Sequence, residues 1–383
     1  LRQKPPKLLY VVNIPRFFIT HRFSLALAAR DAGFDAHIAA SQEDSSALNQ
    51  ITAQGFPFHP LPLSQHGINP VFELRTILAL RKLYADLKPD LLHHVSIKPV
   101  IYGGIAARLT GDIPVIQAMS GLGYTFVSDD LKAKLLALLS QPAFKLALAG
   151  ANTQMIFQNP DDQRVFLERR LIDRAKTTVI RGSGVDETLF APSAEPPSDI
   201  PVVLFAGRLL WQKGVGYFVE LARRLHGKAR FRVVGYEERT SPLNVPAEQL
   251  QTWHDAGLIE WLGKCDDMPA VYAESNIVCL PSTYGEGVPK VLIEAAACAR
   301  ACVATDTPGC REIIQQGENG FLVPPNDVKA LAEAVKRLID DAGLRRDLGA
   351  RGREIVLESF TLRQVIEETI ALYHVALKQA ETT

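Results

Sequence analysis

Short apolar runs alternate with longer amphipathic segments along the chain, and this alternation predicts a series of strands and helices. An apolar run over residues 8–12 precedes a helical pattern over 23–32, which ends at Gly33, and a second run follows over 35–40. A strand, a helix and a strand in this order predict parallel pairing. In the rest of the first half, helices are expected at 74–87 and 102–109. Strands are expected at 90–95, 115–118, 151–158 and 177–180. This half is therefore expected to form a doubly wound sheet.

A proline-rich stretch predicts where this first domain ends. Residues 191–201, APSAEPPSDIP, contain four prolines, a composition typical of a linker. The strand–helix rhythm then restarts. Strands are expected at 202–205, 230–234, 259–262, 277–280 and 301–305, and helices at 290–297, 327–340 and 360–378. The predicted fold class is α/β, with two Rossmann-like domains facing a cleft beyond the carboxyl ends of their strands.

Composition narrows the class of protein. The 383 residues are 47% hydrophobic and 22% charged, as in globular proteins, and the formal net charge of zero does not favour nucleic-acid binding through bulk positive charge. No apolar run approaches the roughly 20 residues of a membrane span, and the first residues lack the pattern of a signal peptide. The five cysteines include no CxxC pair, so we expect a reducing, cytoplasmic compartment.

The strongest chemical pattern is STYGEGVPKVLIEAAA at residues 282–297, directly after the apolar run at 277–280. Gly285 and Gly287 permit a tight turn, and Pro289 suits the first position of a helix, whose free amides favour a phosphate. Glu286 and Glu294 flank this turn. Because an ionised carboxylate only accepts hydrogen bonds, the pair suits the hydroxyl groups of a sugar. Together these features suggest a sugar nucleotide; two solvated acids in an ordinary loop are the alternative.

A second pattern, VVLFAGRLLWQKG at residues 202–214, places two cations after a strand. Arg208 can bind a diphosphate through two parallel hydrogen bonds, and Lys213 adds a point charge. Both would also offset the charges of Glu286 and Glu294. The alternative is a pair of solvated surface cations.

These two patterns, at this spacing and in this order, resemble glycosyltransferase family 4, a family of retaining enzymes with the GT-B architecture. The resemblance implies that Arg208 and Lys213 hold the departing diphosphate, that Glu286 contacts the transferred sugar and that Glu294 contacts the ribose. Gly287 and Val288 would offer backbone amides to the donor. It also implies three parts: an acceptor-binding domain at 1–190, a donor-binding domain at 191–359, and a helix at 360–383 that packs back on the first domain.

The resemblance extends to the nucleotide pocket. The segments FRVVG (231–235) and EWLG (260–263) match positions where the family shapes this pocket, which implies donor contacts at Gly207, Gly235 and Leu262. The expected donor is a UDP-sugar, with an N-acetylhexosamine as the sugar. The segment RGSGVD (181–186) also matches the family, and Asp186 is expected to have a structural role.

The first half differs from the family pattern in two places. The loop NIPRFFITH at 13–21 lacks the family's usual glycines, and we expect Asn13 and Arg16 to bind acceptor or phosphate there. Ser120 and Gly121 stand where many members have a histidine, and they are also expected to contact the acceptor. The wording SGLGY (120–124) resembles a subgroup that assembles bacterial surface polysaccharides, including lipopolysaccharide, on polyprenyl-diphosphate-linked acceptors. The adjacent His93 and His94 either line the cleft or are structural.

The expected partners are a nucleotide-sugar donor, a lipid-linked or other glycan acceptor, and the cytoplasmic face of the inner membrane. Residues 131–149 are apolar with three lysines, a composition that suits either contact with an anionic membrane or a core helix. No cofactor and no metal are expected. Two rival hypotheses are a nucleotide-sugar epimerase on the same fold, which would act without an acceptor, and a non-catalytic subunit that binds nucleotide sugars.

Overall fold

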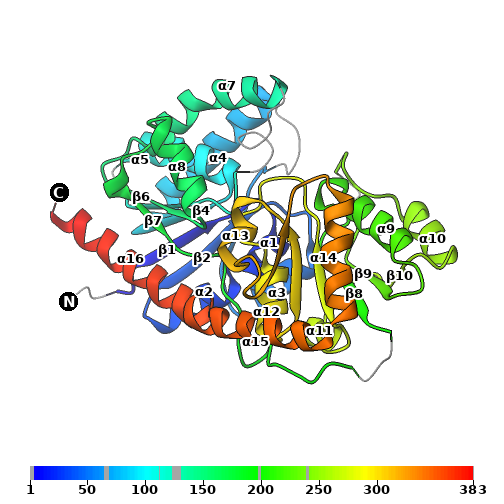
Figure 1. Ribbon diagram of the computed structural model, residues 1–383. Helices are drawn as coiled ribbons and strands as arrows, with labels where there is room; N and C mark the ends of the chain where they lie inside the picture. The colour runs from blue at the N-terminus through cyan, green and yellow to red at the C-terminus, as the bar shows by residue number, and fades with distance from the viewer. Residues whose placement is uncertain are drawn as a thin grey trace. The chain divides into compact units, whose positions relative to one another are not determined.

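The computed structural model describes residues 4–63, 69–111, 113–122, 131–196, 200–238 and 241–382 (Figure 1). The chain divides into two compact units. The first contains Leu1–Ser183 and Val365–Thr383, and the second contains Gly184–Gln364. The sequence predicted domain boundaries between residues 190 and 191 and between residues 359 and 360. In the structure, residues 184–190 and 360–364 instead belong to the second unit.

The first unit is built on a seven-stranded, wholly parallel sheet. Its strand order is β3-β2-β1-β4-β5-β6-β7. The strands are β1 (Lys7–Val11), β2 (Asp35–Ala40), β3 (Phe58–Pro60), β4 (Leu91–Val95), β5 (Val115–Ala118), β6 (Thr153–Phe157) and β7 (Thr177–Val179). All but β3 match the predicted strands. The sequence of β3, FHP, is too short and too polar to give a period-two signal.

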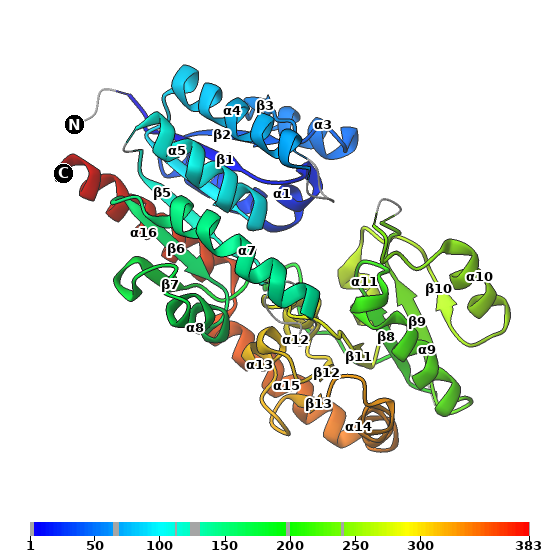
Figure 2. The same ribbon diagram turned by 90° about the horizontal axis from the view of Figure 1, so that it is seen from above.

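Helices cover both faces of this sheet (Figure 2). They are α1 (Pro15–His21), α2 (Phe23–Asp31), α3 (Ser45–Ala53), α4 (Pro70–Leu87), α5 (Gly104–Thr110) after a π-helical turn (Pro99–Gly103), α7 (Leu131–Leu148), α8 (Pro160–Glu168) and α16 (Leu362–Thr382). Because side chains alternate along a strand, Leu8 and Tyr10 of β1 pack with α2 and α16, while Leu9 and Val11 pack with α4 and α5.

The final helix belongs to the first unit from Val365 onward. Thr361 and Gln364 form a capping box: the Gln364 amide donates to Thr361 Oγ1 over 3.3 Å, and the Thr361 amide donates to Gln364 Oε1 over 3.1 Å. Further along, the hydroxyl of Tyr373 lies 2.5 Å from His93 Nδ1 and 3.1 Å from the Tyr10 hydroxyl. All three side chains are fully buried, so this polar cluster fixes the helix against β1 and β4. The expected packing of the last helix on the first domain is confirmed.

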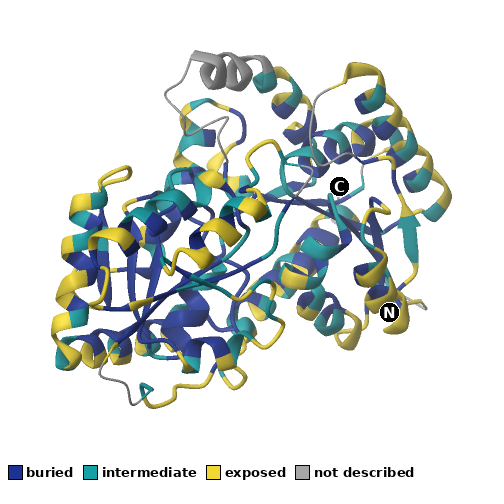
Figure 3. Ribbon diagram, turned by 90° about the vertical axis from the view of Figure 1, so that its right-hand side faces the viewer, coloured by how far each residue is buried: buried dark blue, intermediate teal, exposed yellow. Residues whose placement is uncertain are grey.

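The second unit has a six-stranded parallel sheet in the order β10-β9-β8-β11-β12-β13. The strands are β8 (Val202–Ala206), β9 (Arg230–Val234), β10 (Glu260–Trp261), β11 (Ile277–Leu280), β12 (Ala301–Thr305) and β13 (Gly320–Val323). The flanking helices are α9 (Val215–Arg224), α10 (Ala247–Asp255), α11 (Met268–Ala273), α12 (Lys290–Ala297), α13 (Pro308–Ile313), α14 (Val328–Asp340) and α15 (Ala342–Ser359). The central strands are buried on both faces, which explains their continuous apolar runs (Figure 3).

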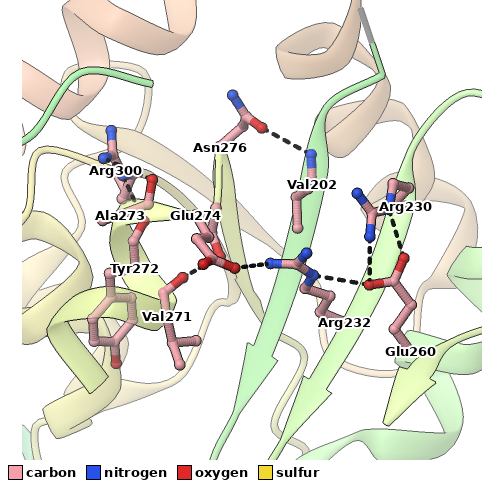
Figure 4. Close-up of polar contacts among 11 residues, drawn as sticks. Val202, Arg230, Arg232, Glu260, Val271, Tyr272, Ala273, Glu274, Asn276 and Arg300 are labelled. Atoms are coloured by element: carbon pink, nitrogen blue, oxygen red, sulfur yellow. Dashed lines mark hydrogen bonds and ion pairs between the residues drawn. The ribbon is translucent and has the colours of Figure 1, made fainter. Parts of the chain in front are cut away.

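Ion pairs connect β9 with β10 and with the segment before β11 (Figure 4). Arg230 and Arg232 both donate to Glu260, and Arg232 also reaches Glu274 over 2.9 Å. Nearby, Glu195 of the predicted linker accepts hydrogen bonds from Arg345 (2.8 Å) and Asn276 (3.1 Å). This part of the linker is therefore held on the second unit.

We expect Tyr373→Phe to destabilise the protein. It removes one hydroxyl and leaves His93 Nδ1 and the Tyr10 hydroxyl without that buried partner, which costs about 1–3 kcal/mol. Urea unfolding followed by circular dichroism measures the change. Tyr217→Phe is the matched control, because the Tyr217 hydroxyl bonds Asn326 at an exposed site. Equal decreases in the free energy of unfolding of the two variants would contradict the structural role of the buried cluster.

Candidate functional site

The predicted donor residues meet at the point where the strand order of the second sheet changes direction. From β8 the chain goes to β9 on one side, and later to β11 on the other. The loops that follow β8 and β11 therefore diverge above neighbouring strands, which is where ligands bind in open α/β sheets. Arg208 and Lys213 lie in the first loop, and Glu286 lies in the second.

Lys213 and Glu286 join these two loops directly. Lys213 Nζ lies 2.6 and 2.7 Å from the two carboxylate oxygens of Glu286, and Ser282 Oγ donates to Glu286 Oε1 over 2.9 Å. Burial lowers the pKa of Lys213, but Glu286 and Tyr284 raise it by more, so the net pKa is above its ordinary value. The ammonium therefore remains charged at neutral pH.

Gly214 explains why the loops approach so closely. It has a φ of +88°, and a Cβ at this position would lie 2.0 Å from the backbone oxygen of Pro281. Only glycine accommodates both the left-handed backbone and the neighbouring chain. The close approach positions Lys213 against Glu286.

Arg208 is held by a residue that the sequence analysis did not identify. Arg208 Nη1 lies 2.9 Å from Glu238 Oε2, and Nη2 lies 3.4 Å from the Tyr284 hydroxyl. Burial lowers the pKa of Arg208, while Tyr284 and Glu238 raise it by more, which keeps the guanidinium charged. Glu238 lies beyond β9 in a loop without a recognisable motif, so no sequence signal linked it to Arg208.

Backbone hydrogen bonds fasten the Glu238 loop to the Arg208 loop. Leu209 N donates to Tyr236 O over 3.1 Å, Trp211 N to Leu243 O over 2.9 Å, and Val245 N to Leu209 O over 2.8 Å. The Glu238 side chain is buried between them. Its contact with Arg208 is therefore set by the fold.

Glu294 has a different environment from Glu286. It lies on α12, largely buried, where the Tyr272 hydroxyl donates to Oε2 over 3.0 Å and Lys290 Nζ lies 3.4 Å from Oε1. Burial, the largest effect, raises its pKa above the ordinary 4.5, although Lys290 and Tyr272 act in the opposite direction. Tyr272, on α11, was another residue that the sequence did not indicate.

The backbone around Gly287 and Val288 is packed against α13. A Cβ on Gly309, in the first turn of α13, would lie 1.2 Å from the Gly287 oxygen. Pro289, which we expected at the first helical position, is instead the residue that caps α12, with extended backbone angles. The turn thus keeps an extended residue between the glycine loop and the helix.

The remaining predicted donor positions lie along the same edge of the sheet. Gly207 follows β8 and Gly235 follows β9, and a Cβ on Gly235 would lie 1.9 Å from the Gly207 oxygen. Leu262 follows β10, one strand further out, with 47% of its side chain exposed. The structure therefore places Gly207 and Gly235 in close contact, with Leu262 one strand further toward the edge of the sheet.

In the first unit, the predicted acceptor residues lie beyond the carboxyl ends of β1 and β5. Asn13 Oδ1 is buried without a hydrogen-bond partner among the described residues. Arg16 Nε lies 2.7 Å from Asp44 Oδ2, so this cation is paired within its own unit. Ser120 Oγ lies 3.4 Å from the Ser96 hydroxyl, and Gly121 has a φ of +114°. Residues 123–130, which complete the SGLGY segment and its loop, lie outside the described residues.

Two histidines and one aspartate are structural. His93 bonds Tyr373, and His94 lies 2.9 Å from the Tyr84 hydroxyl and 3.0 Å from Gln117 Oε1. Burial lowers the pKa of His93 well below its ordinary value and that of His94 to about 4, so both are neutral at pH 7. Asp186 Oδ1 accepts hydrogen bonds from the Thr188 and Leu189 amides, which confirms its expected structural role.

The apolar segment at 131–149 forms α7, with Pro142 inside the helix. The side chains of 131–139 lie outside the described residues, and so does their predicted membrane contact. None of the helices in the described part of the chain has the length and apolar content needed to cross a membrane.

We expect Glu294→Gln to stabilise the protein increasingly as the pH rises. The folded-state pKa lies above the unfolded value of about 4.5, so ionisation of Glu294 costs stability once the pH passes that value. Glutamine avoids this cost and can still accept the Tyr272 hydroxyl. Urea unfolding at about pH 5 and about pH 8 tests the difference. A gain that shrinks at the higher pH would contradict the raised pKa.

The chain is similar to known glycosyltransferases. Residues 7–159 match the family model of glycosyl transferase 4-like domains, and residues 186–355 match that of glycosyl transferases group 1. A Campylobacter jejuni relative, N,N'-diacetylbacillosaminyl-diphospho-undecaprenol alpha-1,3-N-acetylgalactosaminyltransferase, is 29% identical over 77% of this chain and 80% of its own length. An Escherichia coli UDP-Gal:alpha-D-GlcNAc-diphosphoundecaprenol alpha-1,3-galactosyltransferase is 26% identical over 82% of each chain.

The fold also matches solved structures. Anabaena HepE in complex with UDP superposes with a TM-score of 0.75 at 18% identity, over 96% of this chain and all of that one. At this identity the match supports the fold alone. The two family models follow one another along the chain and together include every strand of the two parallel sheets except β7. The chain therefore belongs to the GT-B glycosyltransferases, and it is an enzyme.

Proposed function

We propose that this enzyme transfers a sugar, an N-acetylhexosamine, from a UDP-sugar to a polyprenyl-diphosphate-linked or other glycan acceptor, with retention of the anomeric configuration. The observation that carries the proposal is the set of two cations and two carboxylates at the carboxyl edge of the second sheet. The printed names of the two bacterial relatives, and the UDP in the HepE complex, support this donor and acceptor class.

The cations supply charge for the leaving group. Arg208 and Lys213 would turn from Glu238 and Glu286 toward the diphosphate, where fixed positive charge stabilises the negative charge that develops. Because both are side chains that remain charged, no metal ion is required for this step in our proposal.

The carboxylates would bind hydroxyl groups. Glu286 would orient the transferred sugar, and Glu294 would accept a hydrogen bond from the ribose. The backbone at Gly287 and Val288 would contact the donor, with Gly207, Gly235 and Leu262 around the nucleotide. Asn13, Arg16, Ser120 and Gly121 would contact the acceptor.

The bond changes follow from these roles. The acceptor oxygen bonds to the anomeric carbon on the face from which the diphosphate departs, as the bond from that carbon to the phosphate oxygen breaks. The acceptor proton passes to a phosphate oxygen.

The enzyme would act at the cytoplasmic face of the inner membrane as a peripheral protein, where a lipid-linked acceptor is available.

The direct experiment supplies a panel of nucleotide sugars with a membrane lipid extract as acceptor. Transfer of one sugar into the lipid phase, with the anomeric configuration read by NMR, would support the proposal and identify the donor. An isomerised nucleotide sugar formed without acceptor would instead indicate an epimerase. Tight donor binding without turnover would indicate a binding subunit.

We expect Arg208→Ala and Glu286→Ala each to lower the turnover number by about two orders of magnitude, the usual effect of losing one transition-state contact. Initial rates of sugar transfer measure this. Arg230→Ala is the control, because Arg230 pairs with Glu260 at an exposed position near the start of β9. Near-wild-type turnover in either variant would show that the substituted residue does not have its proposed role in sugar transfer.

We expect Glu238→Gln to bind UDP about threefold to tenfold more tightly than the wild type. The change removes a negative charge that competes with the diphosphate for Arg208 and keeps the size of the side chain. Isothermal titration measures the dissociation constant, with Glu260→Gln as the matched control. Weaker binding in a folded variant would show that Glu238 mainly orients Arg208.

A further inference from the structure

Helix α4 of the first unit exposes a stripe of large apolar side chains. Val71, Leu74 and Leu78 are 70%, 56% and 51% exposed, and their spacing of three and four residues places them on one side of the helix. The opposite side, with Thr76, Leu80 and Tyr84, is buried against the sheet. No other helix exposes more than one large apolar residue among its described side chains. A stripe of this kind marks a contact surface.

The charges around this stripe are mainly positive. The exposed charged side chains of α4 are Arg75, Arg81, Lys82 and Asp86, and Asp86 is paired with Lys82 over 3.1 Å. The neighbouring helix α5, which lies beside α4 in Figure 2, adds exposed Arg108 and Leu109. This combination of apolar and basic side chains is complementary to an anionic lipid surface.

The stripe begins beside the edge of the sheet that holds the predicted acceptor residues. Glu73, in the first turn of α4, accepts a hydrogen bond of 2.8 Å from Lys98, which follows β4. Both side chains are largely buried, so the start of α4 is fixed against this edge. Asn13 and Ser120 follow β1 and β5 at the same edge. A surface docked on α4 would therefore lie near the proposed acceptor site.

We propose that the outer face of α4, with Val71, Leu74, Leu78, Arg75 and Arg81, docks on an anionic lipid bilayer. The inference deepens the proposed function and rests on it for its biological purpose: the bilayer would present the lipid-linked acceptor. A second copy of the chain is a less suitable occupant. In a twofold dimer the same basic side chains would face one another across the interface.

The test measures partition of the full chain into vesicles by co-sedimentation. The vesicles contain phosphatidylcholine with or without phosphatidylglycerol, and no polyprenyl lipid. We expect binding to require phosphatidylglycerol and to weaken with salt. Leu74→Ser with Leu78→Ser should lower the partition coefficient about tenfold or more, and Arg75→Ser with Arg81→Ser should lower it about fivefold or more.

The matched control is Leu357→Ser, which removes an exposed leucine from helix α15 of the second unit. Circular dichroism checks that each variant is folded. Wild-type partition in the folded Leu74/Leu78 variant, or an equal loss in Leu357→Ser, would overturn the proposal. So would a change from dimer to monomer in light scattering with vesicle binding intact, because α4 would then be a protein interface.

UDP binding separates this inference from the proposed function. The α4 variants should bind UDP as the wild type does, since the donor residues lie in the other unit. If the wild type neither binds UDP nor transfers a sugar, but vesicle binding still depends on α4, the proposed function fails and the docking surface stands. If sugar transfer is observed and the α4 variants bind vesicles as the wild type does, the proposed docking surface is wrong and the proposed function is unaffected.

Discussion

The ion pair between Lys213 and Glu286 is the interaction on which the proposed donor site depends. It joins the loops after β8 and β11, which the strand order places side by side, and it is shielded from water. Burying two charges is costly unless each is paired and hydrogen-bonded, and Ser282 supplies the additional donor for Glu286. The pair holds the site's charges in place before any ligand arrives.

The site is balanced in charge, because each cation lies against one carboxylate. Arg208 with Glu238 and Lys213 with Glu286 keep the loops together without an anion. A diphosphate would have to compete with these carboxylates, which links donor binding to a rearrangement of both pairs. Glu294 stands apart: its raised pKa results from burial, with Tyr272 and Lys290 as its partners.

The first unit uses its polar residues differently. The buried histidines of β4 bond tyrosines from α16 and α4, so they stabilise the packing of helices on the sheet and remain neutral. Its proposed acceptor contacts, Asn13 and Ser120, lie further along the sheet, directly after β1 and β5. The exposed stripe of α4 starts beside that same edge, so the proposed acceptor contacts and the proposed membrane surface adjoin.

The sequence by itself determined the two parallel sheets and most of their strands, because buried strands require continuous apolar runs that few other elements resemble. It also predicted Arg208, Lys213, Glu286 and Glu294 as donor-site residues, since the turn glycines and the spacing of charges are local. Short or polar elements such as β3 gave no such signal. The tertiary structure decided the partners: Glu238 and Tyr272 reach the site from separate loops and helices, and His93 meets Tyr373 across 280 residues of chain. Contacts of this kind depend on how the strands are ordered in the sheet, which no local pattern encodes.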